Sequence, residues 1–165
     1  MAIRFNADEV FEMAEKIEVN GAAFYRRAAA LHAQDKESVA FLTRLAEMED
    51  EHRATFAAMR AELPERLREE TAFDPYLEAG LYLNAMADSH GGEGTPAAAD
   101  SLTGKESMTD VLRIAIGLEE KSIVFYLGIQ DMVPEKLGKD KIGRIIAEEK
   151  SHMVTLAGEL KKVRA

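Results

Sequence analysis

The chain has 165 residues, 30 of them acidic and 21 basic, and a formal net charge of −9 at pH 7. This acidic balance argues against a nucleic-acid partner, because binding to nucleic acid needs clustered Lys and Arg. The sequence holds no cysteine, which excludes disulfides, thiol chemistry and cysteine-ligated metal sites. Its length predicts a single domain over residues 1–165, and its abundance of Ala, Glu, Lys and Arg favours an all-α fold.

The N-terminal stretch MAIRFNADEVF lacks the apolar core of a secretory signal peptide. Elsewhere, no uninterrupted apolar run approaches the length that a membrane-spanning helix needs. We therefore expect a cytoplasmic protein with no membrane partner.

Two long amphipathic helices are predicted in the first part of the chain. The first covers residues 6–33, with Asn6 as its N-cap and Glu9 three residues later, as in a capping box. The second covers residues 36–63 and is ended by Pro64. Because the link between them is short, the two helices should form an antiparallel hairpin.

A second helical hairpin is predicted near the end of the chain. Its first helix opens at Ser107, with Asp110 three residues later, and is closed by Pro134. Its second helix covers residues 139–163. No segment shows the alternation of polar and apolar residues that is typical of strands.

The connection between the hairpins is long, covering about residues 64–106. Within it, Asp74 can cap a short extra helix that has Pro75 at its first position. The Gly-, Pro- and Ala-rich stretch over 89–106 is interpreted as a loop. Two hairpins joined by one long connection favour a four-helix bundle with one crossover.

The core-facing seam of each predicted helix contains one acidic residue. Core positions along a helix recur at alternating steps of three and four residues. In every helix, a single Glu occupies one of these positions, with apolar residues at other core positions before and after it. In two helices the next seam position is His; in the other two it is the small Gly21 or Ser122. The six ionisable seam residues are Glu18, Glu49, His52, Glu119, Glu149 and His152. The residues interpreted as solvated surface are His32, Glu47, Asp50, Glu51, His90, Glu120 and Glu148.

The two halves of the chain repeat each other. The phrase EDEHRATF at 49–56 recurs as EKSHMVTL at 149–156, 100 positions later, while Glu18 and Glu119 are 101 positions apart. The bundle should therefore have an approximate two-fold axis, with the seam acids meeting near its middle.

Paired metal ions would explain why a dry seam holds four carboxylates. Each ionised and unpaired carboxylate would cost several kcal/mol in the core, whereas two dications would cancel all four charges. Hard oxygen donors with one imidazole per ion suit iron or manganese, with coordination positions left open for hydrogen peroxide or dioxygen. A hydrogen-bonded core histidine would explain one Glu-x-x-His motif, but two motifs in register with two further acids favour a dinuclear site.

Two tyrosines lie on the same seam. Tyr25 and Tyr126 each follow a Phe, as Phe24-Tyr25 and Phe125-Tyr126. Two interpretations stay open for them: a core tyrosine whose hydroxyl bonds a nearby Glu, or a supporting or redox role in catalysis.

The motifs E-x-x-G-x-x-F-Y and E-x-x-S-x-x-F-Y, alternating with two E-x-x-H motifs, resemble those of the rubrerythrin family in the ferritin-like superfamily. The likeness covers the four long helices. It implies that the six seam residues are the ligands of a diiron centre in a ferritin-like bundle. It also implies reduction of hydrogen peroxide by the diferrous form, with electrons from outside, and a homodimer.

The sequence departs from typical rubrerythrins in two respects. They carry a rubredoxin domain with four cysteines, so here the electrons should come from a separate donor protein. They also have an extra Glu ligand where this chain has Ser122. The six-ligand set resembles bacterioferritin, which keeps open a ferroxidase or iron-storage function; manganese catalase chemistry is a third alternative.

Overall fold

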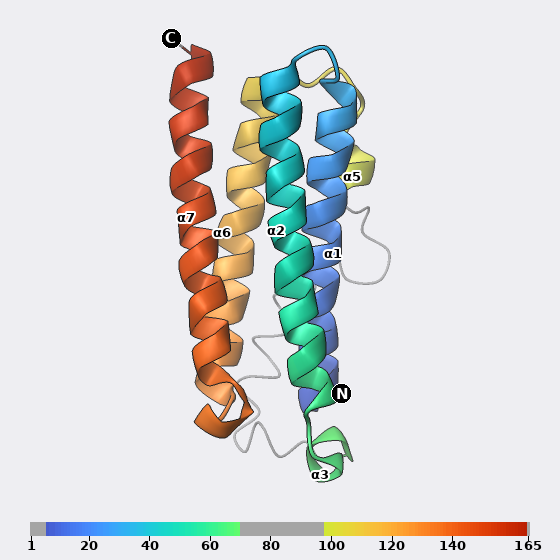
Figure 1. The fold of residues 1–165 in the computed structure, drawn as a ribbon, viewed down its shortest axis with the longest axis vertical. Coiled ribbons are helices and arrows are strands. Elements are labelled where there is room, and N and C mark those ends of the chain that lie inside the picture. Colours follow the sequence, from blue (N-terminus) through green and yellow to red (C-terminus); the bar gives the residue numbers. More distant parts are fainter. Residues whose placement is uncertain (1–5, 70–97, 165) are drawn as a thin grey trace, which may run out of the picture.

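The computed structural model describes residues 6–69 and 98–164, and these residues form helices joined by turns and short links, without a strand. Figure 1 shows the long helices packed side by side as a bundle. They are α1 (Ala7–Leu31), α2 (Lys36–Ala61), α6 (Met108–Met132) and α7 (Lys139–Arg164). The all-α prediction is thus confirmed for these residues. None of their helices is both long enough and apolar enough to cross a membrane.

The predicted capping boxes begin two of the helices. At the start of α1 the Asn6 side chain accepts a hydrogen bond from Glu9 N at 2.9 Å, and Glu9 Oε2 accepts one from Asn6 N at 2.8 Å. Ser107 and Asp110 make the same reciprocal pair at the start of α6. These bonds satisfy backbone N–H groups that have no partner within the helix.

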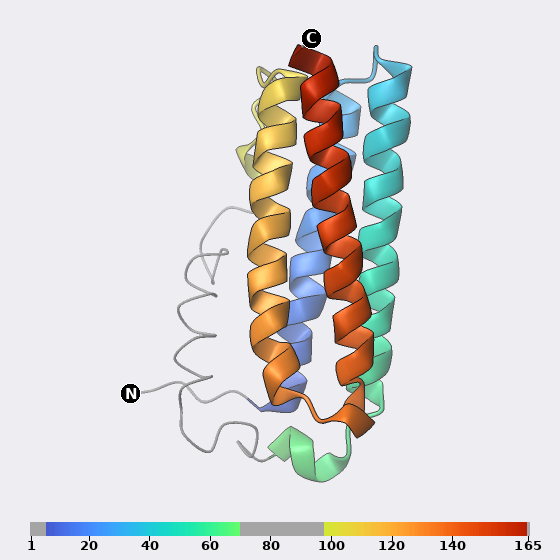
Figure 2. The same cartoon turned by 90° about the vertical axis from the view of Figure 1, so that its left-hand side faces the viewer.

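The helices form two antiparallel hairpins. In Figure 1, α1 and α2 run in opposite directions, as do α6 and α7, while α2 and α6 both run from the top of the view to the bottom. Each hairpin packs closely within itself, and Figure 2 shows all four helices side by side in the second view as well. The C-terminal end of α2 and the N-terminal end of α6 therefore lie at opposite ends of the bundle.

Short helices occur where loops or helix ends were predicted. Helices α3 (Glu65–Glu69) and η1 (Glu135–Leu137) each follow a proline, and α5 (Ala98–Ser101) lies inside the stretch 89–106 that was interpreted as a loop. This part of the loop prediction is wrong, because Ala favours helix and Leu102, directly after α5, is buried against the bundle. The predicted helix at Asp74, the surface position of His90 and the rest of that loop lie outside the described residues.

The core is divided into two apolar clusters. One contains Phe11, Phe56 and Ile142 together with their neighbours; the other contains Leu42 and Leu112. The buried carboxylate and imidazole side chains of the described residues belong to neither cluster. The helices thus enclose a polar layer between two dry regions, and this layer contains the six ionisable seam residues.

Gly138 sets the turn between η1 and α7. Its φ of +102° lies in the left-handed region, and a Cβ there would be 2.9 Å from Cε of Met59. We expect Gly138→Ala to lower the free energy of unfolding by about 1–2 kcal/mol, measured by urea denaturation. Gly158→Ala is the control, because a Cβ at that helical position meets nothing within 4 Å. A Gly138→Ala protein as stable as the wild type would contradict the prediction.

Candidate metal centre

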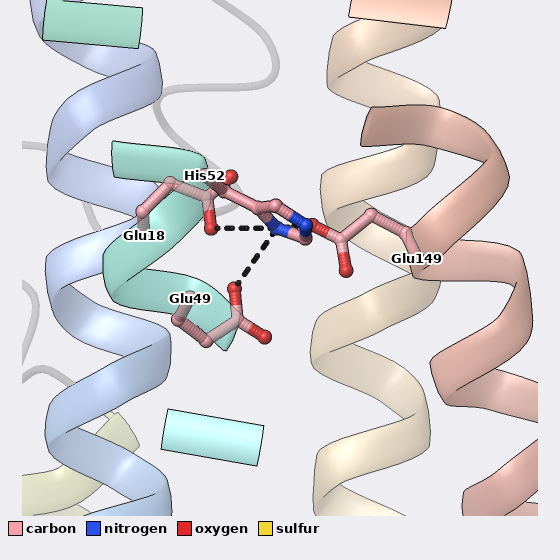
Figure 3. Close-up of side chains that lie close together, drawn as sticks. All are labelled: Glu18, Glu49, His52 and Glu149. Atoms are coloured by element: carbon pink, nitrogen blue, oxygen red, sulfur yellow. Dashed lines mark ion pairs between the residues drawn. The ribbon is translucent and has the colours of Figure 1, made fainter. Parts of the chain in front are cut away.

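Six ionisable side chains from four helices meet in the polar layer. Each is at most 4 % exposed to solvent. Helix α1 contributes Glu18, α6 contributes Glu119, α2 contributes Glu49 and His52, and α7 contributes Glu149 and His152. All six predicted seam residues are therefore brought together. Figure 3 shows four of them pointing toward one another across the space between α1, α2 and α7.

The six residues form two overlapping groups of possible metal ligands. Glu18 and His52 belong to one group, and Glu119 and His152 to the other. Glu49 and Glu149 belong to both, and within each group the ligand atoms lie within 4.8 Å of one another. The structure thus distinguishes two carboxylates that serve both groups from two that serve one each.

His52 directs its Nδ1 atom at three carboxylates. The distances from Nδ1 are 3.1 Å to Glu149 Oε1, 3.6 Å to Glu18 Oε2 and 3.8 Å to Glu49 Oε2. The last two are drawn as dashed lines in Figure 3.

His152 repeats this arrangement in the second group. Its Nδ1 lies 2.9 Å from Glu149 Oε2 and 3.6 Å from both Glu49 Oε1 and Glu119 Oε1. The two imidazole rings stack with centroids 5.6 Å apart. The approximate two-fold relation predicted from the repeat is present in these contacts.

Several of these buried atoms lack a hydrogen bond in spite of their close neighbours. They are Glu18 Oε2, both carboxylate oxygens of Glu149, Nδ1 of His52, and both ring nitrogens of His152. Most buried polar atoms in proteins are hydrogen-bonded, because an unpaired one costs about 1–3 kcal/mol. Oxygen and nitrogen atoms that point into the same space and form no hydrogen bonds with one another could coordinate a cation there. The six residues therefore fit metal binding.

Two tyrosine hydroxyls connect the halves of the centre. Tyr25 on α1 donates a hydrogen bond to Glu119 Oε1 on α6, and Tyr126 on α6 donates one to Glu18 Oε1 on α1. Both tyrosines are buried. Each hydroxyl holds the carboxylate that belongs to a single group, as expected if the tyrosines support the centre from outside.

The ionisation of the metal-free centre reflects burial and mutual contact. Burial raises the pKa of Glu119 to about 8 and that of Glu18 well above its usual range. Burial alone would lower the pKa of His152, but Glu119 and Glu149 outweigh it and raise the value to about 10. Burial would raise the pKa of Glu149, yet the two imidazoles hold it at about 2. Without metal, the layer thus keeps protons on some of its carboxylates and on an imidazole.

No protein-family model, curated protein or solved structure matches this chain. Its function must therefore be inferred from the centre and from its motifs.

The small seam residues have specific neighbours. A Cβ at Gly21 would lie 3.4 Å from Glu49 Cδ, so the room at this position borders the shared carboxylate. The Ser122 hydroxyl donates to the carbonyl of Leu118 at 3.1 Å. Room for ions or substrate at these two positions stays a prediction.

The prediction that Glu148 is only solvated charge is wrong. Its side chain is 55 % exposed, yet its Oε2 lies 2.8 Å from Nε2 of the buried His52. The signal that was overlooked is the Glu-Glu doublet at 148–149, which has no counterpart at 48–49. Asp50, by contrast, pairs with Arg26 on the surface and does not reach the centre.

Tyr25→Phe should destabilise the metal-free protein. It removes the hydroxyl donor from a buried Glu119 oxygen, and an unsatisfied buried group costs about 1–3 kcal/mol. Urea denaturation with a chelator present would measure this loss. Tyr126→Phe should lower the free energy of unfolding by a similar amount, because the Tyr126 hydroxyl donates to a buried oxygen of Glu18 in the same way. If both variants unfold like the wild type, the hydroxyls do not stabilise these carboxylates.

Proposed function

We propose that this chain is a diiron oxidoreductase of rubrerythrin type, which reduces hydrogen peroxide with electrons from an external donor protein. The observation that supports this most is the pair of buried ligand groups sharing Glu49 and Glu149. Two groups that share carboxylates suit two neighbouring ions, and neighbouring ions suit a reaction that needs two electrons. Reduction of one peroxide molecule to two waters takes two electrons and two protons.

The composition of the centre favours iron or manganese over softer metals. Four carboxylates and two imidazoles provide mainly hard oxygen donors, with one nitrogen per ion. Four negative charges would balance two dications, which removes the cost of burying the carboxylates. Glu18 and His52 would hold one ion, Glu119 and His152 the other, and Glu49 and Glu149 would contact both.

The protein's own contribution is to position these ligands and to keep them dry. Tyr25 and Tyr126 hold Glu119 and Glu18 by their hydroxyls. The apolar clusters pack on either side of the ligands, which are at most 4 % exposed. Bound iron would supply the two electrons for cleavage of the O–O bond. A redox role for either tyrosine itself is part of this proposal.

A ferritin-like bundle with one long crossover is also part of the proposal. Helices α2 and α6 run in the same direction, so the connection between them must link opposite ends of the bundle, as in that fold. The homodimer implied by the resemblance belongs here too; size-exclusion chromatography with light scattering would test it.

The decisive experiment is rapid mixing of the anaerobic diferrous protein with hydrogen peroxide and, separately, with dioxygen. Oxidation that is much faster with peroxide, and that forms no mineral, is the result expected. Faster reaction with dioxygen, or retention of dozens of irons per chain, would reject the peroxidase proposal.

Ser122 favours one alternative, a ferroxidase or iron-storage protein. Its hydroxyl bonds a backbone carbonyl, so this position adds no carboxylate to the six-ligand set. In that case ferrous iron would be the substrate and dioxygen the faster oxidant. Manganese in the purified protein, with gas evolved from peroxide, would instead identify a manganese catalase.

A further inference from the structure

The two halves of the centre differ on the outer side of the histidines. Towards the interior, Nδ1 of His52 and Nδ1 of His152 face Glu149 at 3.1 and 2.9 Å. Towards the outside, His52 Nε2 lies 2.8 Å from Oε2 of Glu148. His152 Nε2 is buried and has no hydrogen-bond partner among the described residues. Both inner nitrogens face three carboxylates, although the repeat-equivalent distances differ: 3.8 Å from His52 to Glu49 but 2.9 Å from His152 to Glu149. On the outer side, His52 has a carboxylate partner and His152 has none among the described residues.

One position in the repeat explains this difference. Glu149 and His152 lie 100 positions after Glu49 and His52, so the counterpart of Glu148 is Met48. A methionine sulfur is only a weak acceptor, whereas a carboxylate is a strong one. By this repeat, Met48 corresponds for His152 to what Glu148 is for His52, and a methionine at this position supplies no carboxylate for the outer nitrogen of His152.

A carboxylate on the outer nitrogen of a metal-binding histidine affects metal affinity. It fixes the proton on that nitrogen, leaves the inner lone pair directed at the metal, and makes the imidazole a better donor; removing it typically costs about 10–100-fold in affinity. The bond between His52 and Glu148 uses the proton on Nε2, which stays in place when a metal binds Nδ1. The bond is therefore compatible with a metal ion on Nδ1.

We propose that the two metal positions are inequivalent: the position at Glu18 and His52, supported by Glu148, binds metal about 10–100-fold more tightly and fills first. The position at Glu119 and His152 binds more weakly and exchanges its ion more readily. This inference rests on the proposed two-ion centre. Glu148 acts on it through His52, as a positioning residue.

The location of Glu148 allows a clean test. Glu148 lines a surface cleft of about 520 Å³ between α2 and α7, together with Glu51, Thr55, Lys141 and Arg144. Glu148 itself belongs to neither apolar cluster. Glu148→Met gives both halves the Met-Glu sequence, and Met48→Glu gives both the Glu-Glu sequence. Glu51→Met is the control, since it removes a charge from the same cleft without touching an imidazole.

The test is calorimetric titration of the metal-free protein and its variants with Mn²⁺. We expect Glu148→Met to weaken the tighter step by about 10–100-fold, Met48→Glu to strengthen the weaker step, and Glu51→Met to change neither. Two binding steps in the wild type would not by themselves show that the positions differ, because two ions that share Glu49 and Glu149 repel each other even in equivalent positions. If Glu148→Met weakens the tighter step and Met48→Glu strengthens the weaker one, the difference comes from the carboxylate beside the histidine and not from repulsion between the ions.

A crystal soaked with one equivalent of Mn²⁺ identifies the position that fills first. Anomalous scattering should locate the ion beside His52 in the wild type, with equal occupancy of both positions in Met48→Glu. Equal occupancy in the wild type, or an unchanged titration of both Glu148→Met and Met48→Glu, would overturn the inference and leave the two-ion centre standing. Wild-type binding of fewer than two ions per chain would instead refute the centre itself.

Discussion

Glu149→Ala should remove metal from both positions of the centre at once. The Glu149 side chain is fully buried and belongs to both ligand groups. Its Oε1 lies 3.1 Å from His52 Nδ1 and its Oε2 lies 2.9 Å from His152 Nδ1. Loss of a residue that supports a ligand from outside already costs about 10–100-fold in affinity, so loss of a shared ligand should cost more than about 100-fold for each ion. Peroxide reduction should disappear with the metal.

Elemental analysis of the purified variant, after loading with iron or manganese, would measure this effect. Glu120→Ala is the matched control, because it removes an exposed carboxylate from the same bundle. Glu119→Ala should behave differently from Glu149→Ala and mainly empty the position at His152, since Glu119 belongs to one group only. A Glu149→Ala protein that retains two ions per chain would show that the ligands are wrongly assigned.

The metal-free protein should lose stability as the pH rises from about 4.5 to 10. The folded pKa of Glu119, about 8, and that of His152, about 10, lie above the usual values of 4.5 and 6.5. Each group therefore binds its proton more tightly in the folded chain. The contribution of Glu119 to the free energy of unfolding is complete below pH 4.5 and lost as the pH approaches 8; that of His152 is lost between 6.5 and 10.

Glu149 has the opposite effect at low pH. Its folded pKa of about 2 lies below the usual 4.5, so its contribution is present above pH 4.5 and lost as the pH falls towards 2. Metal binding needs deprotonated ligands, so the stabilisation by added Mn²⁺ should grow with pH. Urea denaturation at several pH values, with chelator or with Mn²⁺, would measure both trends. A flat profile for the chelated protein would show that these groups are not buried together.

The sequence by itself determined the four long helices and the six ligand candidates of the centre. Capping residues such as Asn6 and Ser107 act on backbone groups within the next turn, so a local pattern is enough to find helix starts. Helical periodicity also fixes which face each residue occupies. One acid in every seam, with two followed by His, was therefore sufficient to identify the six buried Glu and His residues of the described part of the chain.

Only the tertiary structure decided how those residues pair. In the sequence, Glu18 and Glu49 are both acids at core positions, and nothing distinguishes their roles. The packing of the helices places Glu49 and Glu149 in both ligand groups, and it brings each tyrosine hydroxyl to a Glu of the other half. It also brings Glu148, which lies off the seam of α7, within 2.8 Å of His52 on α2. Periodicity describes one helix at a time, whereas such contacts depend on the distance and rotation between two helices.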